Sequence, residues 1–127
     1  MKILLDTHIF LWFISKDKSL SNEFKQNLRD QQNEVYLSVA SVWEITIKYQ
    51  LGKLPLPDKA EIYIPTQRKR HQIDSLIIDE GSIKQLAELP RQHRDPFDRI
   101  IIAQALQHDL TLATVDKKVR RYPVNLL

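Results

Sequence analysis

The chain of 127 residues contains no cysteine and only two glycines, and each scarcity excludes a class of site. Without cysteine there is no disulfide and no thiolate metal site, which fits a reducing compartment and leads us to expect a cytoplasmic protein. Gly52 and Gly81 are too few for a Walker-type phosphate loop or a glycine-rich dinucleotide-binding turn, because both motifs need several glycines. Nucleotide binding through such loops is therefore excluded.

Long hydrophobic runs are also missing. The apolar stretches fall far short of the roughly 20 residues that an α-helix needs to cross a bilayer. The first residues carry Lys2 and then reach Asp6 and His8, which makes this stretch too short and too polar for a signal peptide. We therefore expect no membrane span and no secretion signal.

The composition that is present describes a globular protein of modest size. Hydrophobic residues make up 43% of the chain and charged residues 28%, and the length suits one domain, which we predict to span residues 1–127. The formal net charge is +3. This excess of basic side chains is compatible with a polyanionic partner but does not require one.

Segments with a strand pattern alternate with segments with a helical pattern along the chain. The apolar and β-branched runs predict strands over residues 2–5, 34–39, 73–78, 111–115 and 124–127. The helical periodicity and the capping residues predict helices over residues 7–14, 21–31, 41–51, 58–67, 79–89 and 95–108, with a short basic turn or helix at 117–121. Such alternation predicts an α/β fold, with a central and mostly parallel sheet flanked by helices on both faces.

Four acidic residues lie at the edges of apolar segments, where an unpartnered carboxylate is costly to bury. They are Asp6, Glu44, Asp98 and Asp116. Asp6 and Asp116 each leave a predicted strand, and ligands of parallel sheets bind at the carboxyl ends of strands. Asp98 begins a predicted helix, and Glu44 lies near the start of another. If these four positions converge, a divalent cation is the simplest shared partner.

Each acid also has a purely structural explanation. Asp95, Pro96 and Asp98 have the spacing of a capping box at a helix N-terminus, where the negative charges of both acids interact favourably with the helix dipole. Glu44 is four residues before Lys48, which allows an ordinary ion pair on a helix surface. The two readings are compatible, because a helix capped by Asp95 would hold Asp98 rigidly.

These residues resemble the PIN domain, and more closely the ribonuclease toxins of bacterial VapBC toxin–antitoxin pairs. The segments that carry the resemblance are Leu4-Leu5-Asp6-Thr7, Ser41-Val42-Trp43-Glu44, Asp95-Pro96-Phe97-Asp98-Arg99-Ile100-Ile101-Ile102-Ala103 and Thr114-Val115-Asp116. The resemblance covers essentially the whole chain, and the run from His93 to Arg99 is its most distinctive part. It implies a parallel α/β/α sandwich and an endoribonuclease that depends on Mg²⁺ or Mn²⁺.

The resemblance also implies roles for individual residues. The family's acidic positions correspond to Asp6, Glu44, Asp98 and Asp116, which are expected to act as metal ligands and catalytic residues. Thr114 matches a small hydroxyl residue near the site, and Asp95 is an additional acid that acts as a cap or supports the ligands. Apart from the resemblance, basic residues near these motifs are candidate RNA contacts: Arg68, Lys69 and Arg70, then Arg91 and Arg94, then Lys117, Lys118, Arg120 and Arg121. The last group follows Asp116 directly and is the best placed, while a solvated basic surface is the more common explanation of any single one.

A toxin of this kind is expected to form a homodimer, to cleave RNA and to be silenced by a small VapB-like antitoxin. Two alternatives remain open at the level of sequence. A phosphoacceptor receiver domain also gathers acids at strand ends, but it needs an acid pair after its first strand, where this chain has Asp6 and Thr7. A non-catalytic PIN-fold module that binds RNA or protein is the second alternative.

Overall fold

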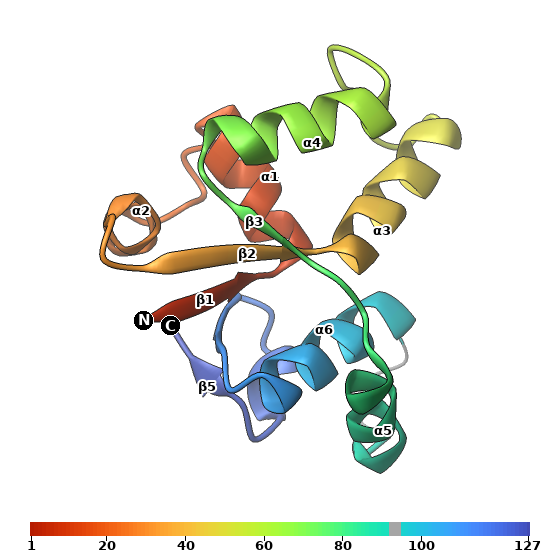
Figure 1. Ribbon diagram of the computed structural model, residues 1–127. Helices are drawn as coiled ribbons and strands as arrows, with labels where there is room; N and C mark the ends of the chain where they lie inside the picture. Colours follow the sequence, from red (N-terminus) through yellow and green to blue (C-terminus); the bar gives the residue numbers. More distant parts are fainter. Residues whose placement is uncertain (92–94) are drawn as a thin grey trace.

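Five short strands form one parallel sheet in the computed structural model, which describes residues 1–91 and 95–127 (Figure 1). The strands are β1 (Lys2–Leu5), β2 (Glu34–Ser38), β3 (Asp74–Leu76), β4 (Thr111–Ala113) and β5 (Asn125–Leu126). Their order across the sheet is β3-β2-β1-β4-β5, and every pairing is parallel. The chain therefore builds outward from β1 to one edge and then crosses back to the other side of β1.

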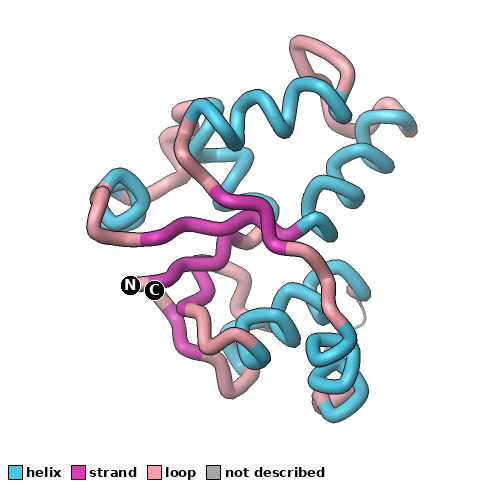
Figure 2. Tube along the Cα trace, in the orientation of Figure 1, coloured by secondary structure: helices cyan, strands magenta, loops and turns pink. Residues whose placement is uncertain are grey.

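Helices cover both faces of this sheet, as Figures 1 and 2 show. They are α1 (Thr7–Ser15), α2 (Asn22–Arg29), α3 (Val39–Gln50), α4 (Ala60–Arg70), α5 (Glu80–Glu88), α6 (Pro96–Gln107) and the short 3₁₀ helix η1 (Val119–Arg121). In the ribbon view, α1 and α4 lie on one side of the strands while α5 and α6 lie on the other (Figure 1). The predicted α/β/α arrangement is confirmed.

The alternation of side chains along β1 explains why two cores form. Ile3 and Leu5 point into a cluster with residues of α1 and α4, whereas Leu4 points to the opposite face and packs with residues of α6. All three side chains are fully buried. A strand covered on both faces must be apolar at successive positions, and this is the pattern that the sequence shows.

Two predicted helix starts differ from the structure. Residues 34–39 were predicted as a strand, but β2 ends at Ser38, because the Ser38 hydroxyl accepts a hydrogen bond from the Ala40 N–H and begins α3 two residues early. The fourth helix was predicted to begin at residue 58, with Asp58 as its cap, and this start is wrong. The Asp58 carboxylate accepts from the adjacent Lys59 N–H, and α4 begins after Lys59 without a side-chain cap. Its Pro65 does not end the helix, which continues to Arg70.

The strands predicted at 73–78, 111–115 and 124–127 are shorter in the structure, at three, three and two residues. The predictions that fall on His93 and Arg94 lie outside the described residues. None of the helices in the described part of the chain combines the length and the apolar character that a membrane span needs.

Candidate active site

A cavity of about 330 Å³ opens at the carboxyl edge of the sheet. Its lining residues are Asp6, Thr7, His8, Glu44, Lys48, Asp95, Asp98, Asp116 and Lys118. All four acids that the sequence singles out therefore line one cavity. The cavity lies where the strand order reverses, because β1 is followed on one side by β2 and on the other by β4. Ligands of open parallel sheets bind at such a reversal.

Asp6 leaves β1 and at the same time begins α1. Its Oδ1 accepts a hydrogen bond of 2.7 Å from the His8 N–H, which makes Asp6 the N-cap of the helix. Its Oδ2 accepts a hydrogen bond of 2.6 Å from the Thr114 hydroxyl. Only 8% of Asp6 is exposed, so these two donors fix the orientation of a nearly buried carboxylate.

Thr114 connects the two acids that leave neighbouring strands. Leu5 and Ala113 are paired in the sheet, so Asp6 and Thr114 come next to each other as β1 and β4 end. The Thr114 hydroxyl, which donates to Asp6, accepts from the Asp116 N–H at 3.1 Å. The Asp116 carboxylate in turn accepts from the Lys118 N–H at 2.8 Å. Thr114 thus connects the Asp6 carboxylate to the backbone of Asp116 through its hydroxyl.

Glu44 reaches the cavity from α3 and is 5% exposed. The Thr7 hydroxyl donates to its Oε1 at 2.8 Å, and the hydroxyls of Thr7 and Ser41 are hydrogen-bonded to each other at 2.9 Å. The Lys48 ammonium donates to its Oε2 at 2.8 Å. Both readings of Glu44 hold at once: it forms the i, i+4 ion pair, and its carboxylate is buried.

Lys48 is the cavity residue whose place in the site the sequence reading missed. The hydrogen bond that the Lys48 ammonium donates to Glu44 raises the pKa of Lys48 against the opposing effect of burial, and the charges of Asp95 and Asp98 raise it further. A raised pKa keeps the ammonium protonated at every pH below its ordinary value near 10.5, and its contribution to folding is lost only as the pH rises above that. The signal available in the sequence was its position four residues after Glu44.

Asp95 and Asp98 have the capping arrangement that their spacing predicts. Asp95 is the N-cap of α6, and its Oδ1 accepts from the N–H groups of Phe97 and Asp98, with Pro96 at the first helical position. Asp98 lies in the first turn and lines the cavity. Because α6 starts at the carboxyl edge of the sheet and runs back to β4, its first turn brings Asp98 to the other acids.

The predicted RNA contacts are placed less uniformly. Lys118 lines the cavity, whereas Lys117, Arg120 and Arg121 are exposed and lie outside its lining. Arg120 donates a hydrogen bond from its guanidinium to the Thr114 carbonyl at 3.2 Å, so one of its donors is already used at the end of β4. Arg94 lies outside the described residues.

The donors that the cavity offers are carboxylate and hydroxyl oxygens, together with the imidazole of His8 at its rim. Mg²⁺ and Mn²⁺ prefer oxygen ligands, and Mg²⁺ keeps several of its waters, so few carboxylates are needed to bind it. The ligand atoms in this cavity are therefore of the chemical type that such an ion binds. As their side chains stand, no three Asp, Glu or His residues among 1–91 and 95–127 form a ready set of metal ligands. Asp6 is hydrogen-bonded to Thr114 and Glu44 to Lys48, so binding an ion would require these carboxylates to exchange or share partners.

The parallel sheet, the acids at its carboxyl edge and the helices on both faces define an α/β domain with an acidic cavity at a strand-order reversal. The chain belongs to the PIN domain family, whose model matches residues 3–125. Membership sets aside the receiver domain that the sequence alone left open.

Two relatives from Mycobacterium tuberculosis are similar in sequence. Ribonuclease VapC16 is 41% identical over 60 residues, which cover 47% of this chain and 43% of that protein. The chain thus matches less than half the length of VapC16. Ribonuclease VapC22 is 26% identical over 126 residues, which cover 94% of this chain and 91% of that protein.

Solved structures share the fold at low sequence identity. VapBC2 from Rickettsia felis, bound to a DNA fragment from its promoter, superposes with a TM-score of 0.75 at 18% identity, covering 100% of this chain and 97% of that chain. DNA-bound VapBC from Salmonella typhimurium gives a TM-score of 0.71 at 19% identity, covering 99% of this chain and 96% of that chain. At these identities the likeness supports the fold.

Proposed function

We propose that this protein is a metal-dependent endoribonuclease that acts as the toxin of a type II toxin–antitoxin pair. The convergence of Asp6, Glu44, Asp98 and Asp116 on one cavity is the observation that carries the proposal. Membership of the PIN domain family and the similarity to proteins named as VapC ribonucleases support it. Because the substrate is cellular RNA, the cytoplasm is the compartment in which we expect it to act.

Asp6 and Asp98 are our first choices for direct ligands of Mg²⁺ or Mn²⁺, and Glu44 and Asp116 would complete the site. A cation held there would supply an activated water and offset the negative charge of the phosphodiester. Thr114 holds the Asp6 carboxylate in one orientation, and this kind of outer support is what sets the position of a ligand.

Lys48 and Lys118 place two positive charges on the lining of an acidic cavity. A phosphodiester entering beside Glu44 would meet the Lys48 ammonium, which donates to that carboxylate and is 43% exposed. Lys48 is thus placed to contact the RNA backbone while remaining paired with Glu44. Positive groups fixed at the point where phosphate charge develops favour the reaction.

We infer two partners from the same similarity. The solved structures that share the fold are VapBC toxin–antitoxin assemblies, which supports a small antitoxin as the inhibitor of this chain. A homodimer is the assembly state that we expect for the toxin. Size-exclusion chromatography with light scattering, with and without the product of the neighbouring reading frame, tests both.

The proposed chemistry is tested with purified protein and a single-stranded RNA. We expect cleavage with Mg²⁺ or Mn²⁺, none with EDTA, and a loss on the order of 100-fold or more in Asp98→Asn, because the substitution removes a charged ligand. Asp58→Asn is the matched control, since Asp58 is an exposed acid in the loop before α4 and should leave cleavage unchanged.

Mapping of RNA 5′ ends after induction in cells, with wild type and Asp98→Asn compared, identifies the target. Cleavage that survives in Asp98→Asn or ignores EDTA would refute the metal-dependent mechanism. RNA binding with no cleavage under any metal would instead favour the non-catalytic PIN-fold module.

A further inference from the structure

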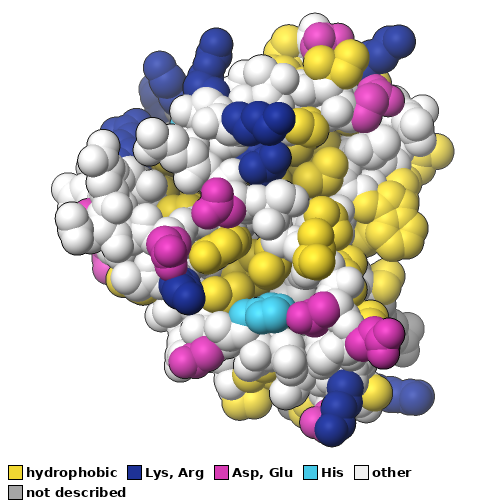
Figure 3. All heavy atoms as spheres, in the orientation of Figure 1, with side chains coloured by type: hydrophobic (Ala, Val, Ile, Leu, Met, Phe, Trp, Pro, Cys, Tyr) yellow, Lys and Arg dark blue, Asp and Glu magenta, His cyan; other side chains and the backbone are white. Residues whose placement is uncertain are grey.

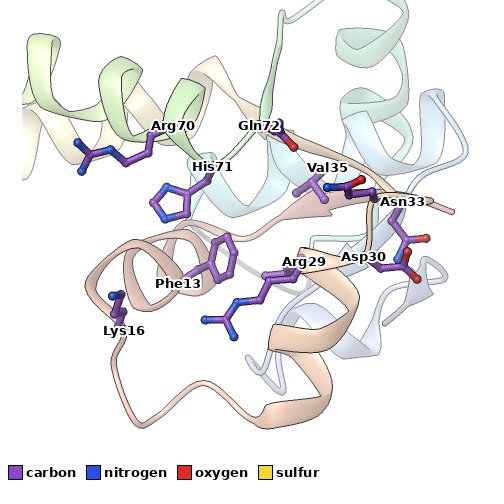
Figure 4. A pocket seen from close by; sticks show the side chains of 11 residues that line it. Phe13, Lys16, Arg29, Asp30, Asn33, Val35, Arg70, His71 and Gln72 are labelled. Carbon is purple, nitrogen blue, oxygen red and sulfur yellow. The ribbon is translucent and has the colours of Figure 1, made fainter.

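A second and larger cavity, of about 570 Å³, lies at the other end of α1 (Figure 4). The N-terminus of α1 contributes Thr7 and His8 to the acidic cavity, whereas its C-terminal part contributes Phe13 and Lys16 to this one. The two cavities are therefore connected by a single helix of nine residues. At a rise of 1.5 Å per residue, that helix holds them about 14 Å apart.

Three basic side chains reach this second cavity from three different elements. Lys16 follows α1, Arg29 ends α2 and Arg70 ends α4, and all three are exposed. Figure 4 shows Lys16 and Arg29 on either side of Phe13, with the Arg70 side chain extending outward from the end of α4. Figure 3 shows Lys and Arg side chains gathered over and beside α4. The cavity is thus a place where separate parts of the fold bring positive charge together.

These three cations are not neutralised by the protein in the part of the chain that the structure describes, where none of them lies within ion-pair distance of a carboxylate. Asp30 is the one acid in the described lining, and its Oδ1 accepts from the Gln32 N–H at 2.9 Å. The cavity consequently offers three uncompensated donors to an anion. Arg is well suited to phosphate, because its planar donors match the phosphate oxygens.

The backbone at Lys16 adds an independent observation. Lys16 is the C-cap of α1 and adopts the left-handed conformation, with φ of 57°. Glycine is the residue that takes this conformation without steric cost. Gln72 and Asp109 adopt the same left-handed conformation, so at Lys16 it marks the end of α1 and sets the direction in which the chain leaves the cavity.

Aromatic side chains contribute to the cavity lining. The rings of Phe13 and His71 lie 5.2 Å apart, and Nδ1 of His71 lies 2.8 Å from the Gln67 carbonyl, so that nitrogen carries the proton. Phe13 is 8% exposed. The cations therefore lie around packed aromatic rings.

We propose that this cavity binds a backbone phosphate of the RNA substrate, at a fixed distance from the bond that is cleaved. The proposal rests on the proposed ribonuclease function, and it assigns to Lys16, Arg29 and Arg70 a contact that the acidic cavity does not supply. An RNA long enough to span α1 contacts both cavities, whereas a very short RNA contacts only the acidic one. The cavity thereby favours longer single-stranded substrates.

The test compares a labelled 12-nucleotide single-stranded RNA with a 3-nucleotide RNA, using the wild type and the triple variant Lys16→Gly, Arg29→Gln, Arg70→Gln. Binding is measured by anisotropy in an Asp98→Asn background, which prevents cleavage. We expect the triple substitution to weaken binding of the long RNA on the order of tenfold. The slope of log K against log salt should fall by about 0.7 for each phosphate contact removed. In the cleaving protein, kcat/KM should fall for the long RNA and stay within twofold for the short one.

Lys84→Gln is the matched control, because Lys84 is an exposed cation on α5, on the other side of the sheet. Lys16→Gly alone also serves as a folding control, since glycine suits the left-handed conformation and should not lower the melting temperature.

Long-RNA binding and cleavage equal to wild type in the triple variant would overturn the phosphate contact while leaving the ribonuclease assignment intact. Loss of antitoxin binding with RNA binding unchanged would assign the cavity to an acidic protein segment and overturn the proposal. A wild type that neither binds nor cleaves RNA would overturn both.

Discussion

Several side chains of the candidate site make structural contacts and line the cavity at the same time. Asp6 caps a helix with one carboxylate oxygen and accepts from Thr114 with the other, and Asp95 caps α6 while lining the same cavity. Glu44 is held by one hydroxyl and one ammonium. Because the fold itself uses these carboxylates, their positions are set by hydrogen bonds within the protein, and an ion would bind by sharing or replacing those partners.

Thr114 allows this support to be tested separately from the acids. Replacing it by valine removes the 2.6 Å donor to the nearly buried Asp6 carboxylate. Hydrogen bonds to charged groups contribute about 1.5–3 kcal/mol, so urea denaturation should show a loss of that order. Metal affinity should also fall about 10- to 100-fold. Thr114→Ser keeps the hydroxyl and should behave close to wild type; equal losses in both variants would contradict the role of the hydrogen bond.

At the scale of elements, an Asp or Ser side chain caps the N-terminus of most helices in the described part of the chain. The N-caps of α1, α2, α3, α5 and α6 are Asp6, Ser21, Ser38, Asp79 and Asp95, and each accepts a hydrogen bond from a backbone N–H of its helix. These caps satisfy donors that would otherwise lack partners. Three of the five capping residues, Asp6, Ser38 and Asp95, come where the chain turns into a helix at the carboxyl edge of the sheet, and Asp6 and Asp95 also line the acidic cavity.

Asp79 makes the contribution of one cap measurable through pH. Its hydrogen bonds with Ser82, and after them the charge of His108, lower the pKa of the Asp79 carboxyl below 3.8. A lowered folded pKa means that the stabilisation is present above 3.8 and is lost as the pH falls through the folded value. Asp79→Ala should therefore lower the melting temperature at pH 7, and the difference should shrink as the pH falls below 3.8. A difference that stays constant down to pH 2 would argue against a charged cap.

At the scale of the whole molecule, the parallel sheet decides where the charges meet. Both faces of β1 are buried, so polar side chains next to this strand can reach solvent only where the strand ends. The crossover from β3 to β4 through α5 and α6 returns the chain to the other side of β1. Residues more than 100 positions apart, Asp6 and Asp116, thereby line one cavity.

Folding and metal binding should be coupled through that cavity, because carboxylates gathered at low exposure repel one another until a cation is bound. If Mg²⁺ binds only the folded chain, at 100 times its dissociation constant it stabilises folding by about 2.7 kcal/mol. We expect the melting temperature of wild type to rise by several degrees with Mg²⁺ or Mn²⁺, and the rise to be much smaller in Asp6→Asn. A Na⁺ control at equal ionic strength separates binding from screening, and an equal rise in both proteins would contradict a site at Asp6.

Much of the fold could be read locally. Apolar runs such as Ile3-Leu4-Leu5 predict buried strands, and Asp95 followed by Pro96 predicts a helix start, because these patterns depend on neighbours in the chain. The errors in the predicted boundaries also have local causes. Ser38 ended its strand early because its hydroxyl capped the next helix, and α4 runs to Arg70, beyond the predicted end at residue 67.

The sequence by itself determined the α/β class, the family resemblance and the four candidate acids, since motif order and side-chain chemistry are written along the chain. Only the tertiary structure decided that Thr114 donates to Asp6, that Lys48 belongs to the acidic cavity and that Lys16, Arg29 and Arg70 surround a second one. Those contacts join residues from different elements. Their positions depend on strand order and helix packing, which no single segment of the chain encodes.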